Sequence, residues 1–192
     1  MTNPFTAFEP PLAGPPDLPP TDVSYVLEDT DVGRLLIAVR ADGALVTCTY
    51  APDAEAEDRW LSRLAETVSP RVLRHPRPTD GVRRGLAAYL AGTTRRVDAR
   101  PDLALASPFQ REVLSRLAAR VGYGERTTYA ALANAVERPG AARAVGTALG
   151  ANPLCIVLPC HRVLPASGGV GGYAGGPAAK EHLLELEDAH QR

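Results

Sequence analysis

The chain has 192 residues, of which 45% are hydrophobic and 22% are charged, as is ordinary for a globular protein of one large or two small domains. Its formal net charge of −1 does not indicate a strongly electrostatic nucleic-acid binder, although residues 108–192 carry 9 basic against 7 acidic side chains. No segment resembles a signal peptide or an apolar run of about 18 residues, so we expect a cytoplasmic protein without a membrane anchor.

Cysteine and histidine usage also restricts the chemistry. The three cysteines, Cys48, Cys155 and Cys160, form an odd set without regular spacing, which is not the pattern of a disulfide framework. The four histidines are scattered, and no spacing typical of a zinc site is present. We therefore expect reduced thiols, no metal and no cofactor.

The first part of the chain divides into a tail and a small domain. Residues 1–22 contain seven prolines and no apolar periodicity, which predicts a disordered tail. Short β-rich runs separated by turn residues follow, and Asp42-Gly43 between two of them indicates a hairpin. Apolar residues at helical spacing come next. The predicted strands are 23–28, 34–40 and 44–50, and the predicted helices are 55–68 and 79–90. Residues 23–106 are thus expected to form a small antiparallel sheet covered by helices, with a structural role and no catalytic residue.

The second part is predicted to be helical. Ser107-Pro108-Phe109-Gln110 combines an N-cap serine, a proline in the first turn and a glutamine three residues after the cap, so a helix begins there and ends near Gly122. Two shorter helices, 128–136 and 141–149, are joined by Glu137-Arg138-Pro139-Gly140, which is typical of a helix-turn-helix. The fold class is therefore α+β, and residues 107–192 form a C-terminal helical, winged-helix-like domain.

The second helix of this pair is poor in bulky side chains. Ala142, Ala144 and Gly146 leave little volume around it, and Arg143 is its single long charged residue. Such a helix can approach another surface closely, or it can pack tightly inside its own domain. The residues alone leave both interpretations open.

The segment around Cys160 is a candidate nucleophilic site. Cys160 follows an apolar run and immediately precedes His161 and Arg162. A thiol reacts as the thiolate, and a neighbouring base or positive charge lowers its pKa from about 8.5. A buried cysteine without any chemical role is the alternative, because free cysteine is among the most buried residue types.

Taken together, these motifs resemble the O6-alkylguanine-DNA alkyltransferases, which are the methylated-DNA-protein-cysteine methyltransferases. The resemblance covers most of residues 107–187 and keeps the motif order. It is carried by Pro108-Phe109-Gln110-Arg111, Tyr123-Gly124, Thr128-Tyr129, Ala142-Arg143-Ala144-Val145-Gly146, Asn152-Pro153, Pro159-Cys160-His161-Arg162-Val163, Gly172-Tyr173-Ala174-Gly175-Gly176 and Lys180.

The resemblance implies a DNA-repair protein that takes the alkyl group from O6 of guanine onto Cys160 in a single, irreversible turnover. A water, His161 and Glu187 would activate the thiol, Tyr129 would neutralise the charge that develops on the leaving guanine, and Asn152 would be the hinge before the cysteine segment. The resemblance also implies a substrate pocket, formed by Tyr173, Gly171, Pro159, Cys155 and Lys180.

The implied partner is double-stranded DNA that contains O6-alkylguanine. The lesion must be rotated out of the duplex, and Arg143 would fill the gap while the helix with Ala142, Ala144 and Gly146 lies in the minor groove together with Tyr129. Binding would be independent of sequence. We expect a monomer, and cooperative binding along DNA stays open.

A few positions depart from the family pattern. They include Gly122, Arg126 and the proline-rich tail, and we expect none of them to touch the chemistry. Cys155 and Ala174 leave the accepted size of alkyl group open.

Three other functions compete with this interpretation. A binding-only relative would lack the acceptor cysteine, whereas Cys160 is present. A Cys-His hydrolase would need an oxyanion hole, for which the sequence offers no support. A transcription regulator would carry a further regulatory domain, which this chain does not show.

Overall fold

The computed structural model describes residues 21–190. The predicted tail therefore lies outside the described residues, apart from its last two positions. One of these, Asp22, belongs to the folded domain, because its carboxylate accepts hydrogen bonds from Arg71 at 2.6 and 3.0 Å.

The N-terminal domain is built on a four-stranded sheet in the order β3-β2-β1-β4. The strands are β1 (Val23–Thr30), β2 (Gly33–Arg40), β3 (Leu45–Tyr50) and β4 (Val72–Arg74). The first three pair antiparallel as predicted, but β4 pairs parallel to β1. The sheet is thus mixed, not antiparallel. Sequence patterning missed β4 because this edge strand has only three residues and no buried face.

Tight turns join the three antiparallel strands. Thr30 pairs with Gly33 across the first turn, where Gly33 has a φ of +115°. Gly43 in the second turn has a φ of +79°, and Asp42 Oδ1 accepts a hydrogen bond from Ala44 N at 3.0 Å. Positive φ values favour glycine, which is why the Asp-Gly signal located this hairpin correctly.

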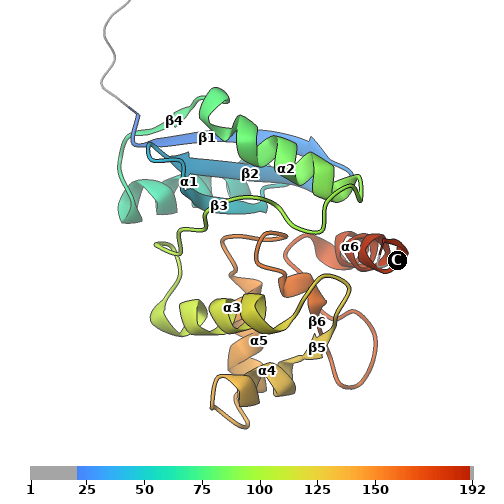
Figure 1. Cartoon of the computed structure of the whole chain (residues 1–192). Helices are drawn as coiled ribbons and strands as arrows, with labels where there is room; N and C mark the ends of the chain where they lie inside the picture. Colours follow the sequence, from blue (N-terminus) through green and yellow to red (C-terminus); the bar gives the residue numbers. More distant parts are fainter. Residues whose placement is uncertain (1–20, 191–192) are drawn as a thin grey trace, which may run out of the picture.

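Two helices cover opposite faces of the sheet (Figure 1). Helix α1 (Ala54–Thr67) packs through Leu64 on the face that carries Leu36 and Ala38. Helix α2 (Asp80–Leu90), preceded by the 3-10 turn η1 (Arg77–Thr79), packs on the other face. That second face belongs to the same continuous core as the C-terminal domain.

The C-terminal domain is mainly helical and carries the predicted helix-turn-helix. Its helices are α3 (Pro108–Arg120), α4 (Tyr129–Ala135), α5 (Ala142–Gly150) and α6 (Gly176–Ala189). The 3-10 turn η2 (Cys160–Arg162) and two short parallel strands, β5 (Thr127–Thr128) and β6 (Val163–Leu164), complete the domain. Within the α4–α5 turn, Glu137 and Gly140 adopt φ values of 58° and 86°.

The Ser107-Pro108-Phe109-Gln110 motif forms a capping box at the first turn of α3. Ser107 Oγ accepts a hydrogen bond from Gln110 N at 3.3 Å, and Gln110 Oε1 accepts one from Ser107 N at 2.9 Å. Gln110 Nε2 also donates to Ala148 O and Ala151 O at 3.2 and 3.3 Å. The Gln110 side chain therefore caps the N-terminus of α3 and also donates hydrogen bonds to carbonyl groups at the C-terminus of α5.

The two domains are also joined through backbone hydrogen bonds. Cys48 N donates to Pro153 O at 2.8 Å, and Thr47 Oγ1 donates to the same carbonyl at 2.9 Å. Cys48 and Leu154 form a parallel bridge. The edge of the sheet thus fixes the segment that leads to Cys160.

Between residues 21 and 190, no helix combines the length and the apolar character that crossing a membrane would need.

We expect Ser107→Ala to lower the free energy of unfolding by about 1 kcal/mol, because the first turn of α3 loses its cap. Urea denaturation of the full chain measures this change. Ser115→Ala is the matched control, since Ser115 is exposed in the middle of α3 and alanine is the better helix former there. Equal losses in both variants would contradict the capping role.

Candidate active site

The segment from Asn152 to Cys160 is held by buried hydrogen bonds. Asn152 is 1% exposed, and its Oδ1 accepts a hydrogen bond from Leu154 N at 2.9 Å. Its Nδ2 donates to Leu158 O at 3.0 Å and to Cys160 Sγ at 3.1 Å. The asparagine predicted as a hinge therefore also contacts the candidate nucleophile directly. Ile156, at a φ of 71°, turns the chain between them.

Cys160 begins η2 and is 5% exposed. The pKa of its thiol lies below the ordinary value because Cys155 and Asn152 donate hydrogen bonds to it and Lys180 is a nearby positive charge, whereas burial acts in the opposite direction. Burial and the same contact raise the pKa of Cys155. Of the two neighbouring thiols, Cys160 is thus the one that favours the thiolate.

His161 is fully buried beside the carboxylate of Glu187. The distance between His161 Nε2 and Glu187 Oε1 is 2.7 Å, so Nε2 carries the proton and donates it to the carboxylate. His161 Nδ1 has no hydrogen-bond partner among the described side chains and is left as the basic nitrogen. Burial lowers the pKa of His161, while the hydrogen bond to Glu187 opposes this effect, so the ring is neutral near pH 7 and able to accept a proton.

Glu187 is the centre of this cluster. It is 0% exposed, whereas the other acidic residues on α6 are exposed: Glu181, Glu185 and Asp188. Besides His161, its carboxylate accepts hydrogen bonds from Arg162 Nε at 2.9 and 3.1 Å and from Gly124 N at 3.0 Å. Burial alone would raise the pKa of Glu187, but the hydrogen bonds from His161 and Arg162 hold it far below the ordinary value.

Arg126, which was expected not to touch the chemistry, contacts Glu187, a residue of the predicted relay. Its Nη1 lies 3.1 Å from Glu187 Oε2, and its Nη2 contacts Asp188 Oδ1 at 2.7 Å. The guanidinium also contacts the backbone of α6, where its Nη2 donates to Leu184 O at 2.9 Å. The only signal in the sequence was that Arg126 departs from the family pattern.

The N-terminal domain, in which no catalytic residue was predicted, also contacts the predicted relay residue Glu187. Tyr89, on α2, donates a hydrogen bond to Glu187 Oε1 at 2.5 Å. Nothing in the sequence around Tyr89 distinguishes it from a core tyrosine, because the contact spans 98 positions of the chain.

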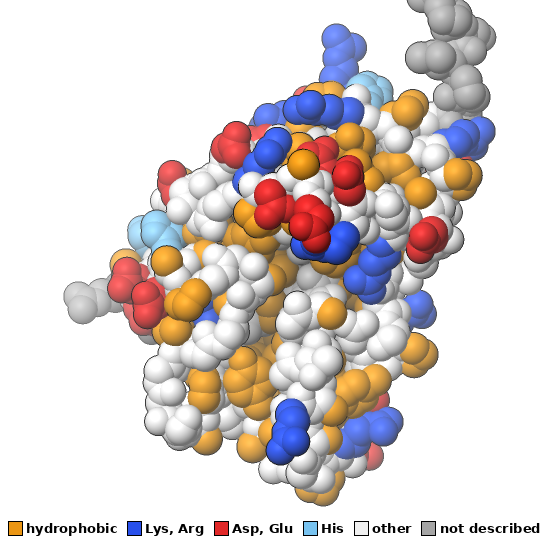
Figure 2. Space-filling view, turned by 180° about the vertical axis from the view of Figure 1, so that it is seen from behind, with side chains coloured by type: hydrophobic (Ala, Val, Ile, Leu, Met, Phe, Trp, Pro, Cys, Tyr) orange, Lys and Arg blue, Asp and Glu red, His pale blue; other side chains and the backbone are white. Residues whose placement is uncertain are grey.

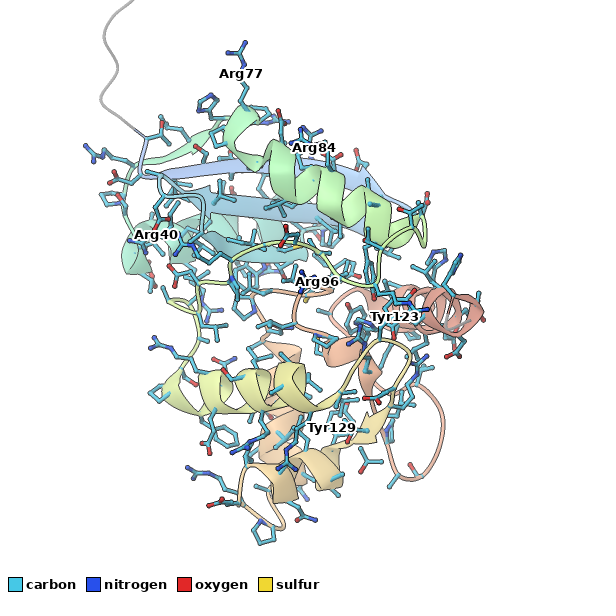
Figure 3. The ribbon with its side chains drawn as sticks, in the orientation of Figure 1. Arg40, Arg77, Arg84, Arg96, Tyr123 and Tyr129 are labelled. Carbon is cyan, nitrogen blue, oxygen red and sulfur yellow. The ribbon has the colours of Figure 1, made fainter. Side chains whose placement is uncertain are left out.

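Cys160 opens into a cavity of about 250 Å³. Tyr129 lines this cavity; it is the first residue of helix α4 and is half-buried (Figure 3). The remaining lining residues come from α5 and from the glycine-rich loop before α6: Gly146, Leu149, Gly150, Gly172, Tyr173 and Ala174. The helix-turn-helix and the candidate nucleophile therefore share one cavity.

Four residues predicted to form the substrate pocket do not line this cavity. Pro159 and Cys155 are buried in the core, and Lys180 is 0% exposed, donating from Nζ to Val163 O at 2.7 Å. Gly171 shapes the loop instead, because a Cβ at its φ of +68° would lie 2.8 Å from Pro165 Cγ. Packing against neighbouring segments decides where these four side chains lie. The spacing of motifs in the sequence does not show which of them line a cavity.

Tyr173 is the predicted pocket residue that does line the cavity. Its ring packs edge-on against Tyr50 of β3 at a centroid distance of 5.5 Å, and the two hydroxyl oxygens lie 3.5 Å apart. A Cβ on Gly175 would lie 2.3 Å from the Tyr50 ring. A glycine at that position therefore lets the loop lie directly on the sheet domain.

Helix α5 presents the predicted DNA-contacting residues at the surface. Arg143 and Ala144 are exposed, and Ala142 and Gly146 are half-buried. Gly146 leaves room for Tyr129, since a Cβ there would lie 3.7 Å from the tyrosine ring. The face seen in Figure 2 has charges of both signs over the N-terminal domain and fewer charged side chains over the lower, C-terminal part.

Comparison with known proteins decides the family. Residues 108–189 match the family model described as the DNA-binding domain of 6-O-methylguanine DNA methyltransferase. A methylated-DNA–protein-cysteine methyltransferase from Mycolicibacterium paratuberculosis is 39% identical over 172 residues, which cover 88% of this chain and 94% of that protein. The chain belongs to the methylated-DNA–protein-cysteine methyltransferase family. The resemblance in its motifs is thereby confirmed.

Solved structures of this methyltransferase family share the fold. O6-methylguanine methyltransferase from Mycobacterium tuberculosis superimposes with a TM-score of 0.72 at 33% identity, covering 88% of this chain and 95% of that one. The OGT from the same organism, solved in complex with DNA, gives a TM-score of 0.72 at 34% identity. The match covers 87% of this chain and 94% of that one. The O6-methylguanine-DNA methyltransferase from Pyrococcus kodakaraensis gives a TM-score of 0.62 at 27% identity. The match covers 86% of this chain and 98% of that one.

We expect Glu187→Gln to lower the free energy of unfolding by about 3 kcal/mol near pH 7, because Arg162 would stay buried without its carboxylate partner. Since the pKa of Glu187 is lower in the folded protein than in the unfolded chain, its charge stabilises the fold above the unfolded pKa of about 4.3, and this contribution is lost as the pH falls through the folded value. Urea denaturation at a series of pH values measures both effects.

The difference in stability between the wild type and Glu187→Gln should therefore be constant above about pH 5 and shrink in more acidic solution. Glu185→Gln is the control, because Glu185 is exposed on the same helix. A difference that does not change with pH would show that the charge of Glu187 is not what stabilises the fold.

Proposed function

We propose that Cys160 accepts the alkyl group of O6-alkylguanine in duplex DNA, and that each molecule does so once. Membership of the family makes the activity DNA repair by alkyl transfer to a cysteine. The observation that carries the assignment to Cys160 is its place in the cavity wall, next to a buried histidine whose other nitrogen is hydrogen-bonded to Glu187.

The proposed reaction is a displacement at a saturated carbon. The thiol proton of Cys160 passes through a water to His161 Nδ1, and the thiolate attacks the alkyl carbon. The new S–C bond forms as the C–O6 bond breaks, and the electron pair of that bond stays on the guanine. The resulting thioether has no carbonyl group that water can attack, so the cysteine is not regenerated.

Tyr129 is proposed to assist the departure of the guanine. Its ring lines the cavity that Cys160 enters, and burial raises the pKa of its hydroxyl, with the nearby Cys160 adding to the effect. The hydroxyl therefore keeps its proton near pH 7 and can donate it toward the purine as negative charge develops there. The guanine then leaves protonated and neutral, Tyr129 regains a proton from water, and His161 releases the proton that it took from the thiol.

Helix α5 is proposed to lie in the minor groove, with Arg143 filling the space that the extruded nucleotide vacates. The exposed Ala144 and the half-buried Ala142 and Gly146 leave little side-chain bulk near Arg143. This supports a close approach of the helix to DNA, although helix-turn-helix proteins usually dock in the major groove. Readout in the minor groove is degenerate, so binding would be independent of sequence. We further infer a monomer acting in the cytoplasm, where the three free cysteines stay reduced.

Intact-protein mass spectrometry after incubation with excess duplex DNA containing O6-methylguanine tests the acceptor. We expect one added methyl group on Cys160 and no further turnover. Cys160→Ser should show no added mass yet bind the same duplex with nearly unchanged affinity. Cys155→Ser is the matched control and should still be methylated. A methyl group found on any other residue would overturn the assignment, and lesion binding without transfer would indicate a recognition module.

Arg143→Ala should slow the repair of duplex DNA by about tenfold or more, because extruding the base costs a few kcal/mol that the arginine no longer offsets. Reaction with free O6-benzylguanine should be nearly unchanged, since no base has to be extruded. Arg84→Ala controls for the lost charge, because Arg84 is exposed on α2 in the other domain (Figure 3). Equal losses on duplex and free base in Arg143→Ala would count against the role.

A further inference from the structure

Tyr89 brings the N-terminal domain into direct contact with the candidate relay. It lies in the last turn of α2 and is 1% exposed. Its hydroxyl donates to Glu187 Oε1 at 2.5 Å and lies 3.5 Å from His161 Nε2. Tyr89 Oη, Glu187 Oε1 and His161 Nε2 therefore form a compact buried triangle made by three separate elements.

The end of α2 is fixed beside α6, so this contact is not an isolated one (Figure 1). Gly92 follows α2 with a φ of +70°, and a Cβ there would lie 2.5 Å from the ring of His190. Val82 and Leu86, on the same helix as Tyr89, are buried in the core that the two domains share. The backbone of α2 thus holds the Tyr89 hydroxyl at a set position relative to Glu187.

The donors around Glu187 are divided between its two oxygens. Oε2 accepts from Arg126 and from the backbone of Gly124, whereas Oε1 accepts from His161 and Tyr89; Arg162 Nε contacts both oxygens. Each hydrogen bond to a carboxylate oxygen draws charge from it. Tyr89 therefore competes with His161 for the charge of the same oxygen.

We propose that Tyr89 is a positioning residue through which the N-terminal domain sets how tightly His161 holds a proton, by sharing Glu187 Oε1 with it. The proposal rests on the proposed role of Cys160 as the alkyl acceptor. It assigns to the N-terminal domain a direct effect on the reactivity of the thiol, in addition to its structural role.

A neighbouring, half-buried tyrosine directs its hydroxyl to a backbone carbonyl and not to the carboxylate. Tyr123 packs edge-on against Tyr89 with ring centroids 5.9 Å apart, and its own hydroxyl donates to the backbone carbonyl of Leu186 at 3.5 Å. The hydroxyl of Tyr89 is instead directed at the oxygen that His161 uses. Removing the hydroxyl of Tyr89 therefore tests its contact with Glu187, and removing the hydroxyl of Tyr123 is the matched control.

The charged and titratable groups that face the Tyr89–His161 contact come from each element packed around it. They are Glu187 on α6, Arg162 on η2, Arg126 and Tyr123 in the loop before β5, and Tyr173 in the glycine-rich loop, whose ring centroid lies 6.3 Å from that of His161. Tyr89→Phe leaves all of them in place and removes one hydroxyl group. A change in the pH dependence of the reaction can therefore be attributed to that hydrogen bond.

The test is the rate of alkylation of Cys160 by free O6-benzylguanine, followed by intact-protein mass between about pH 5 and pH 9. Loss of the hydroxyl leaves more charge on Oε1, so His161 holds its proton more tightly. We expect the acidic limb of the profile to move to higher pH by about half to one unit in Tyr89→Phe. The rate below the limb should then fall about fivefold, with little change on the alkaline plateau.

Tyr123→Phe should leave the limb where it is in the wild type. A Tyr89→Phe profile with an unmoved limb, whether the rate is unchanged or uniformly lower, would overturn the proposal, because a merely structural role lowers the rate equally at every pH. The melting temperature of each variant is measured at the same pH values to separate unfolding from altered reactivity.

Tyr89→3-fluorotyrosine provides a second test that preserves the shape of the side chain. Fluorine makes the phenol a stronger hydrogen-bond donor, so the limb should move in the opposite direction, to lower pH. An unmoved limb in this variant as well would reject the proposal. If the wild-type protein shows no alkylation of Cys160 at any pH, the proposed function fails instead, so the two failures are distinguishable.

Discussion

The buried carboxylate of Glu187 is the interaction on which the rest of the site depends. A charge at 0% exposure is tolerated only when hydrogen-bond donors surround it. Here the donors come from α2, η2 and the loop before β5, and α6 carries the carboxylate. The requirement to satisfy this one carboxylate therefore ties four parts of the chain together. It also fixes which nitrogen of His161 carries the proton, and so leaves Nδ1 as the basic nitrogen.

This constraint explains why the two domains form a single functional unit. The sheet domain contacts the cysteine segment through Pro153, contacts the glycine-rich loop through Tyr50 and Tyr173, and contacts the candidate relay through Tyr89. The helical domain supplies the candidate nucleophile, the cavity and the helix that is proposed to face DNA. A change at the domain junction is thus expected to act on reactivity as well as on stability.

The same architecture separates binding from chemistry. Helix α5 exposes Arg143 on its outer side and lines the cavity with Gly146, Leu149 and Gly150. The thiol, in contrast, lies in the cavity wall, and buried groups that do not reach the surface lower its pKa. A rigid helix that carries both a surface contact and a cavity wall can couple docking on DNA to delivery of a base.

The sequence by itself determined the family, the helix-turn-helix and the identity of the candidate thiol, histidine and glutamate, because caps, turn residues and the Pro-Cys-His-Arg-Val block are local signals. It also located the hairpin at Asp42-Gly43, where the glycine has a positive φ. Only the tertiary structure decided that β4 runs parallel, that Lys180 and Cys155 lie outside the cavity lining, and that Arg126 and Tyr89 bind Glu187. These features depend on contacts between residues far apart in the chain, and no local pattern encodes which distant donor will satisfy a buried charge.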